Sequence, residues 1–266
     1  MALEQRRQER RPLWSELLAG LEWLALKASP VYYGIGAPRG DGVPVVLVPG
    51  FLGTDRSLLE MHLWLGRMGY RSYLSGIGRV ADCPDVLLER LLETVDRAHR
   101  ETGKKVRIIG HSLGGLLARA AAVRAPHQID QVVTMASPFR RLAAHPSVLA
   151  LIGLVRNRAL VRRFSEAEGS CECSFLDALR EPMPASVTRA AIYTKGDPVV
   201  DWRDCAETDG TLNIEVSGTH VGLVFNSQVF RELAQLLAEP LPVQKPNRAV
   251  PQRVSGLKRA SLKRAA

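Results

Sequence analysis

The chain has 266 residues, of which 46% are hydrophobic and 24% are charged, and its formal net charge is +9. This length and apolar content suffice for one large core, and alternating strand and helix signals favour a single α/β domain. No apolar run is long enough to span a bilayer, and the charged N-terminus lacks the apolar region of a secretory signal. We therefore expect a cytoplasmic location, either free or peripheral to a membrane.

Residues 1–42 are expected to form a basic segment followed by an amphipathic helix. In the stretch RPLWSELLAGLEWLALKAS, one helical face carries Leu13, Leu17, Leu21 and Leu24. Such a helix usually packs its apolar face on its own domain. The arginine-rich flank at residues 6–11 supports a second interpretation, in which the helix lies on a membrane surface.

Residues 43–239 carry the strand and helix signals of the main domain. Predicted strands cover residues 43–48, 71–75, 105–110, 129–136, 187–194 and 211–216. The first strand leads into PGFLGTDRS, where Gly50 and Gly53 allow the backbone to approach a bound molecule closely. If the chain contains a serine nucleophile, the amide of Phe51, with Leu52 behind it, is the candidate donor to an oxyanion from this loop.

The stretch VRIIGHSLGGLLARAAA, residues 106–122, predicts a strand, a sharp turn and a helix. Its G-x-S-x-G pattern places Ser112 at the apex of the turn, and Gly110 and Gly114 remove side chains that would collide there. The following helix would leave the amide of Leu113 free to face an oxyanion. A glycine-rich turn with an incidental serine is the competing interpretation, so the rest of the chain must decide.

A serine nucleophile on such a turn needs an acid and then a histidine later in the chain. The strand TRAAIY is followed by a turn that carries Asp197 and then Asp201, and LNIEVSGTHVGLVFN places His220 in a loop after the last strand. We expect Asp197 to orient His220, because a Gly-Asp-Pro turn holds it at the strand end, and we keep Asp201 as the alternative. The other five histidines, His62, His99, His111, His127 and His145, are interpreted as surface or packing residues.

These motifs resemble bacterial lipases and esterases of the α/β-hydrolase superfamily. The likeness rests on PVVLVPGFLGTDRS, LWLGRMGYRSY, VRIIGHSLGGLLAR, VVTMASPFR, AAIYTKGDPVVDWRDC and VSGTHVGLVFNSQVF, which cover most of residues 43–237. It implies Ser112, Asp197 and His220 as a catalytic triad and the amides of Phe51 and Leu113 as oxyanion donors. The spacing and chain order of the serine, acid and histidine select the same residues.

The resemblance implies the α/β-hydrolase fold, with helices on both faces of a mostly parallel sheet. Too little sequence precedes Val43 for the two antiparallel strands that often start this fold, so we expect a reduced sheet. Residues 139–187 are too long for a plain crossover. They favour equally a crossover helix packed on the sheet and, as the resemblance implies, a small helical cap that lines an acyl pocket.

Cysteine spacing gives no zinc motif, since GSCECS is a C-x-C pattern with no histidine ligand beside it. Free thiols are the first expectation for a cytoplasmic chain. A disulfide from Cys171 or Cys173 to Cys205 is the alternative, and it would join a cap to the floor of the site. We expect no metal and no cofactor.

Residues 240–266 form a basic tail that contains no acid. Its basic residues are Lys245, Arg248, Arg253, Lys258, Arg259, Lys263 and Arg264. A disordered, solvated tail is the first expectation, with attraction to anionic lipid as a second and nucleic acid as an unfavoured partner.

The sequence thus predicts a serine hydrolase that cleaves carboxylic esters of apolar acyl groups through an acyl-enzyme. Its partner would be a small-molecule or lipid ester, with peripheral membrane contact through the N-terminal helix or the tail. An acyltransferase or thioesterase with the same triad is the alternative within enzymes. A non-catalytic binding protein would be expected to lack one of these parts, and none is missing.

Overall fold

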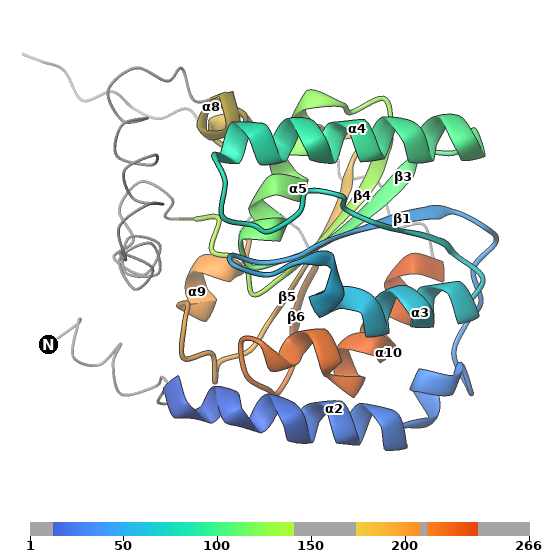
Figure 1. Ribbon diagram of the computed structural model, residues 1–266, viewed down its shortest axis with the longest axis vertical. Helices are drawn as coiled ribbons and strands as arrows, with labels where there is room; N and C mark the ends of the chain where they lie inside the picture. The colour runs from blue at the N-terminus through green and yellow to red at the C-terminus, as the bar shows by residue number, and fades with distance from the viewer. Residues whose placement is uncertain (1–12, 141–173, 208–211, 239–266) are drawn as a thin grey trace, which may run out of the picture.

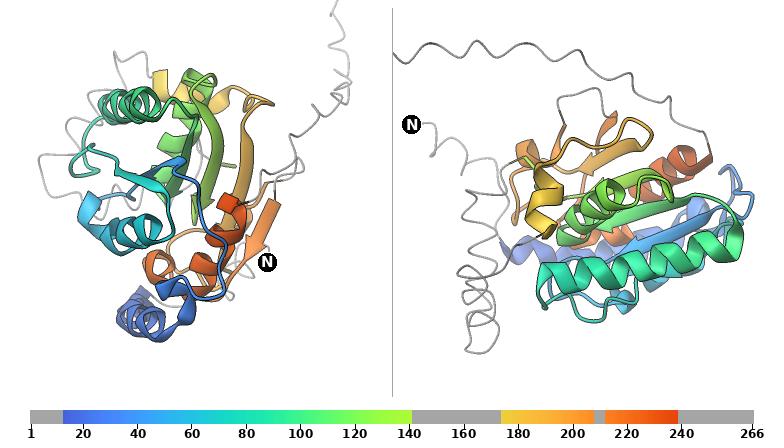
Figure 2. Two further views of the ribbon diagram at one scale, coloured as in Figure 1. Left: turned by 90° about the vertical axis from the view of Figure 1, so that its right-hand side faces the viewer. Right: turned by 90° about the horizontal axis from the view of Figure 1, so that it is seen from above.

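The computed structural model describes residues 13–140, 174–207 and 212–238, which form a sheet with helices on both faces (Figures 1 and 2). The strands are β1 (Pro44–Val48), β2 (Arg71–Leu74), β3 (Val106–His111), β4 (Ile129–Met135), β5 (Thr188–Tyr193) and β6 (Leu212–Glu215). They lie in the order β2-β1-β3-β4-β5-β6, and each neighbouring pair is parallel. This confirms the predicted α/β class, and every predicted strand boundary is within one residue of the observed one.

The inner strands are buried over most of their length because helices cover both sides of the sheet. All five residues of β1, Pro-Val-Val-Leu-Val, are buried, whereas the edge strands β2 and β6 are largely half-exposed or exposed. A parallel strand that is buried on both faces needs a continuous apolar run rather than alternation. The carboxyl ends of β3, β4 and β5 therefore meet at one edge of the sheet, which is where loops carry side chains in open α/β folds.

One face of the sheet is covered by α4 (Pro84–Thr102), α5 (Leu113–Arg124) and α8 (Ser174–Arg180) (Figure 1). Small residues let α5 lie close to the strands, since its sequence LGGLLARAAAVR buries six glycine and alanine residues beside its buried leucines. A side chain at Gly115 would collide with the hydroxyl of Ser137, which follows β4. The close approach of α5 fixes the start of this helix, and hence Ser112, relative to the sheet.

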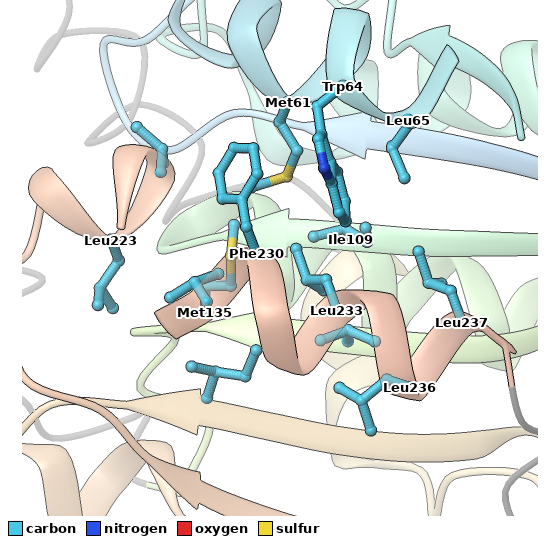
Figure 3. Packing of buried hydrophobic residues seen from close by; sticks show 14 of the residues in the cluster. Met61, Trp64, Leu65, Ile109, Met135, Leu223, Phe230, Leu233, Leu236 and Leu237 are labelled. Atoms are coloured by element: carbon cyan, nitrogen blue, oxygen red, sulfur yellow. The ribbon is translucent and has the colours of Figure 1, made fainter. Parts of the chain in front are cut away.

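The opposite face is covered by α3 (Leu59–Arg67) and α10 (Ser227–Ala238), with the short helices η2 (Pro30–Tyr33), η3 (Asp55–Leu58) and η4 (Gly222–Phe225) beside them. Figure 3 shows the packing between these helices and the sheet, where the rings of Trp64 and Phe230 lie 4.8 Å apart between centroids. Trp64 also donates a hydrogen bond of 2.9 Å to the Val31 carbonyl, so its buried indole N–H is satisfied. This core supports η4, which directly follows the loop of His220.

The N-terminal helices η1 (Leu13–Leu18) and α2 (Ala19–Ala28) lie outside this second face, along α10 and η4 (Figure 1). Their attachment includes Lys27 and Tyr32, which both bind the Glu60 carboxylate of α3, at 2.7 and 2.5 Å. The expectation that the leucine face packs on the domain is wrong: Leu13, Leu17, Leu21 and Leu24 are between 56% and 83% exposed. The helices turn their polar side inward instead, because two glutamates bind backbone amides of the loop at residues 219–221.

Several predictions made from the sequence lie outside the described residues. These are most of the cap segment, at residues 141–173 with Cys171 and Cys173, and the basic tail at 240–266. The domain boundaries, the cap and the disulfide to Cys205 stay predictions. Among the helices that the structure describes, none combines the length and the apolar character that a membrane crossing requires.

Candidate active site

Ser112 lies at the sharp turn between β3 and α5, as the G-x-S-x-G pattern predicts. Its backbone has φ 51° and ψ −121°, a conformation that costs a non-glycine residue roughly 1–3 kcal/mol and persists only where its surroundings enforce it. Here the Ser112 amide donates to the Met135 carbonyl at 2.8 Å. A side chain at Gly110 would collide with the Gly114 backbone, and one at Gly114 would collide with the carbonyls of Val48 and Pro49.

Asp197 and His220 are joined by a hydrogen bond of 2.7 Å between Oδ2 and Nδ1. Their side chains are buried, with 1% and 6% exposed, respectively. The other oxygen, Oδ1, accepts the amides of Val199 and Val200 at 2.8 and 2.9 Å, which fixes the plane of the carboxylate. Because an ionised carboxylate only accepts, Nδ1 of His220 carries the hydrogen, and Nε2 of the neutral ring is left as an acceptor.

Asp201, the alternative acid, has a different place. It caps the short helix α9 (Trp202–Cys205), where its Oδ1 accepts the Arg203 amide at 3.1 Å. The side chain of Asp201 is buried, so this cap contributes to the order of the loop beyond Asp197. Of the two candidates, the structure brings Asp197 to the imidazole.

His111 connects the serine turn to the histidine loop, a role that sequence reasoning missed. Its Nε2 is 2.9 Å from the carbonyl oxygen of His220, and the two rings lie 4.9 Å apart between centroids. Since the carbonyl only accepts, His111 donates from Nε2. The interpretation of His111 as a surface or packing residue is therefore incomplete: this residue is buried, but its polar ring is used. Its place next to Ser112 is the one sequence signal that could have indicated the contact.

The two histidines differ in charge preference. Burial alone disfavours the protonated ring of His220, but the Asp197 carboxylate, supported by that of Glu16, outweighs burial and raises the pKa of His220 above its usual value. For His111, burial and then repulsion from His220 outweigh the His220 carbonyl and the Asp197 carboxylate, and they lower its pKa to about 3. His111 is thus a neutral hydrogen-bond donor at neutral pH, while His220 is suited to gain a proton.

The two predicted oxyanion donors are on the loop after β1 and at the start of α5. Leu113 is the first residue of α5, where backbone amides have no intrahelical acceptor. The Leu52 amide donates to the Val80 carbonyl at 2.8 Å, which leaves Phe51 as the donor from the other loop. Within the described ranges, neither the Phe51 nor the Leu113 amide has an acceptor in the protein. A Cβ at Gly50 would lie 3.0 Å from Ser112 Cβ, so this loop closely approaches the serine turn.

Apolar side chains near the site divide into two groups. Leu52 and Val221 are 40% and 45% exposed, and Phe51 and Leu113 are half-buried. Leu223 and Val224 of η4 are buried in the core and do not line the entrance. In the part of the chain that the structure describes, no group of three or more His, Cys, Asp or Glu side chains could hold a metal ion.

Comparison with known proteins gives a family model and distant relatives that each match part of the chain. Residues 81–155 match the family model of the PGAP1-like alpha/beta domain. The chain is 35% identical to a triacylglycerol lipase of Burkholderia plantarii over 133 residues, which are 46% of this chain and 37% of the lipase. It is 36% identical to a triacylglycerol lipase of Pseudarthrobacter phenanthrenivorans over 107 residues, covering 36% of this chain and 33% of that lipase. The matches thus span about a third of the length of these relatives.

Solved structures agree on the fold. A metagenomic carboxyl esterase superposes with a TM-score of 0.52 at 17% identity, over 76% of this chain and 75% of the esterase. The mature lipase BlEst2 of Bacillus licheniformis gives 0.53 at 14% identity, over 76% of this chain and 95% of the lipase. At these identities the likeness establishes the fold alone. The chain therefore has the α/β-hydrolase fold, with distant homology to bacterial triacylglycerol lipases.

Proposed function

We propose that this protein hydrolyses carboxylic esters of apolar acyl groups through an acyl-enzyme on Ser112. The observation that carries the proposal is the buried bond between Asp197 and His220, in a loop that His111 ties to the serine turn. The positive φ of Ser112 is costly to maintain, and such strained residues cluster at reactive sites. The distant homology to triacylglycerol lipases supports the same reaction class.

In this mechanism, Ser112 Oγ attacks the ester carbonyl carbon while Nε2 of His220 takes the hydroxyl proton. Asp197 stabilises the imidazolium that forms, and the amides of Phe51 and Leu113 donate to the oxyanion. Collapse of the intermediate breaks the bond to the alcohol, which leaves with the proton from His220. Water then attacks the acyl carbonyl carbon while His220 takes its proton. The bond from this carbon to Ser112 Oγ breaks, His220 returns the proton to Oγ, and the carboxylic acid leaves.

The substrate side of the proposal rests on the exposed apolar groups around the site. Leu52 and Val221 are exposed beside half-buried Phe51 and Leu113. An apolar surface of this kind favours an acyl chain over a charged group. Each buried methylene contributes about 0.8 kcal/mol, so kcat/KM should rise several-fold for each two-carbon step until the acyl site is full. Nitrophenyl esters from acetate to hexanoate test this, and a flat or falling series would contradict it.

Ser112→Ala tests the nucleophile. Ester turnover should fall by about three or more orders of magnitude, because only binding and oxyanion contributions remain. Ser137→Ala is a matched control, since this nearby serine is also buried but its hydroxyl bonds the Met135 carbonyl. Near wild-type turnover in Ser112→Ala would refute the mechanism.

An acyltransferase or thioesterase would use the same residues and differ in the second half of the reaction. Supplying a competing alcohol or a thioester separates these activities: hydrolysis predicts free acid as the main product from an oxygen ester in water. A non-catalytic binding protein predicts no burst of nitrophenol and no Ser112 dependence.

We further propose that the exposed leucine row of the N-terminal helices contacts an anionic lipid surface. Leu13, Leu17, Leu21 and Leu24 are exposed with Trp14, and the sequence directly before them is arginine-rich. An amphipathic helix with a basic flank binds such surfaces through its apolar face. Wild type should co-sediment with phosphatidylglycerol vesicles, and a Leu17→Glu, Leu21→Glu double variant should not. Equal binding by the wild type and the double variant would contradict the proposal. A cytoplasmic location stays a prediction.

A further inference from the structure

Two carboxylates of the N-terminal helices bind the loop that carries His220. Glu16 accepts the His220 amide through Oε1 at 2.9 Å and the Val221 amide through Oε2 at 2.8 Å. Glu22 accepts both the amide and the hydroxyl of Thr219 through Oε1, each at 2.9 Å. Three consecutive backbone amides are therefore bound by side chains that lie about two hundred residues earlier in the chain.

The loop is built to let these carboxylates approach. A Cβ on Gly218 would lie 2.9 Å from Glu22 Oε2, and one on Gly222 would collide with Glu22 Oε1. Glu22 Oε2 also accepts Asn226 Nδ2 at 3.1 Å, so the carboxylate spans both ends of the loop. Glycine on either side of residues 219–221 thus makes room for this contact, which packing of an ordinary surface helix would not require.

The arrangement exposes apolar surface. The same helices leave Leu13, Leu17, Leu21 and Leu24 facing outward, although burial of a leucine side chain is favourable. Turning the helices about their axis would bury some of this surface but would withdraw Glu16 and Glu22 from the loop. Carboxylate hydrogen bonds to backbone amides are stronger than neutral ones, which is consistent with the observed orientation.

We propose that Glu16 and Glu22 are positioning residues, which hold the histidine loop so that the imidazole of His220 lies between Asp197 and Ser112. This inference rests on the proposed function, in which His220 transfers the proton. Every polar group of His220 except Nε2 then has a fixed partner: the amide binds Glu16, the carbonyl binds His111, and Nδ1 binds Asp197. Among the residues that the structure describes, Nε2, the atom that must exchange a proton, has no hydrogen-bond partner.

The negative charge of Glu16 should affect the pKa of His220, which a purely structural role would not change. The titratable groups around His220 are Asp197 on the loop after β5, Glu16 on η1 and His111 at the end of β3. The negative charge of Glu16 adds to that of Asp197 in raising the pKa of His220. Neutralising Glu16 should therefore lower this pKa and move the acidic limb of the kcat/KM profile to lower pH.

Glu16→Gln and Glu22→Gln test the proposal, with Glu60→Gln as the matched control. Glu60, on α3, binds Lys27 of α2 and Tyr32 of η2, and these contacts are separate from those of the histidine loop. Misplacing a catalytic group by about 1 Å can cost on the order of a hundredfold, so we expect kcat to fall about 10- to 100-fold in Glu16→Gln and Glu22→Gln. KM should change little, and only Glu16→Gln should shift the acidic limb strongly. Glu60→Gln should lower stability while kcat and the limb stay near wild type.

Equal loss of kcat in Glu60→Gln, or an unchanged kcat and limb in Glu16→Gln, would overturn the positioning role. If circular dichroism shows that Glu16→Gln does not fold, the kcat of Glu22→Gln, again compared with Glu60→Gln, decides the question. NMR titration of His220 in a Ser112→Ala background separates this inference from the proposed function. The pKa of His220 should fall when Glu16→Gln is added, whether or not the wild type cleaves esters, and an unchanged value would contradict the inference.

Discussion

Asp197→Asn is the most informative change in the site, because its neighbours determine how the new side chain is oriented. Oδ1 of Asp197 accepts the amides of Val199 and Val200, at 2.8 and 2.9 Å. An asparagine keeps both bonds only if its carbonyl oxygen stays at that position. Its NH₂ group then faces Nδ1 of His220, where the native carboxylate oxygen lies at 2.7 Å.

This orientation forces His220 into the wrong tautomer. An NH₂ group can only donate, so Nδ1 must become the acceptor and the ring hydrogen moves to Nε2. Nε2 can then no longer take the proton of Ser112, and the imidazolium loses its negative partner. We expect kcat to fall roughly 10³- to 10⁴-fold, which corresponds to about 4 to 5 kcal/mol of transition-state stabilisation. Folding should be nearly unaffected, because the turn keeps its two amide bonds.

Steady-state hydrolysis of a nitrophenyl ester, with thermal unfolding of the same preparation, measures both quantities. Asp201→Asn is the control, since Asp201 caps α9 and asparagine also caps helices well. It should keep most of the turnover. If Asp201→Asn abolished turnover while Asp197→Asn kept it, the tautomer argument and the choice of acid would both be refuted.

Two further changes test the serine turn and His111. Gly114→Ala should lower the free energy of unfolding by roughly 1–3 kcal/mol or more, because the new Cβ would collide with the backbone of Val48 and Pro49. Gly66→Ala in α3 is the control, since a Cβ there meets open space and the change should be neutral or stabilising. Thermal unfolding distinguishes the two variants, and similar shifts in both would contradict the steric argument. The fold lowers the pKa of His111 to about 3, so between pH 6.5 and 3 the unfolded chain binds a proton at His111 that the folded chain does not. The free energy of unfolding therefore falls as the pH drops through this range, by up to about 1.4 kcal/mol per pH unit. His111→Gln keeps an N–H donor and should remove this contribution in urea unfolding at graded pH; an unchanged pH dependence would count against it.

Local patterns were sufficient to predict the sheet and the serine turn. Parallel strands buried on both faces are continuous apolar runs, such as VVLV in β1, and glycine or proline marks their ends. The turn at Ser112 requires glycine at fixed positions because backbone atoms occupy the space of the missing side chains. Asp197 was chosen over Asp201 for a local reason too, its rigid turn at the strand end. These features depend on residues that are close together in the sequence.

Contacts between distant segments were not predicted, and Glu16 shows why. A glutamate on an amphipathic helix is normally a solvated surface residue, and its charge is uninformative unless its neighbours in space are known. The leucine row at Leu13, Leu17, Leu21 and Leu24 predicted burial of the wrong face because periodicity reports amphipathicity but not which face meets the domain. Only the fold shows that the polar side faces the domain, where Glu16 and Glu22 bind the backbone amides of residues 219–221.

Such contacts between distant segments explain how a short loop can hold a buried imidazole. Residues 217–221 form no helix or strand before η4, so their own backbone does little to restrict His220. Side chains of other segments restrict it instead, and three of them bind His220 directly: Glu16 from η1, His111 from the serine turn and Asp197 from the loop after β5. Because the contact of His111 adjoins Ser112 in the chain, a shift of the histidine loop and a shift of the serine turn are coupled. Loss of the Glu16 contact should therefore shift the serine turn as well as His220.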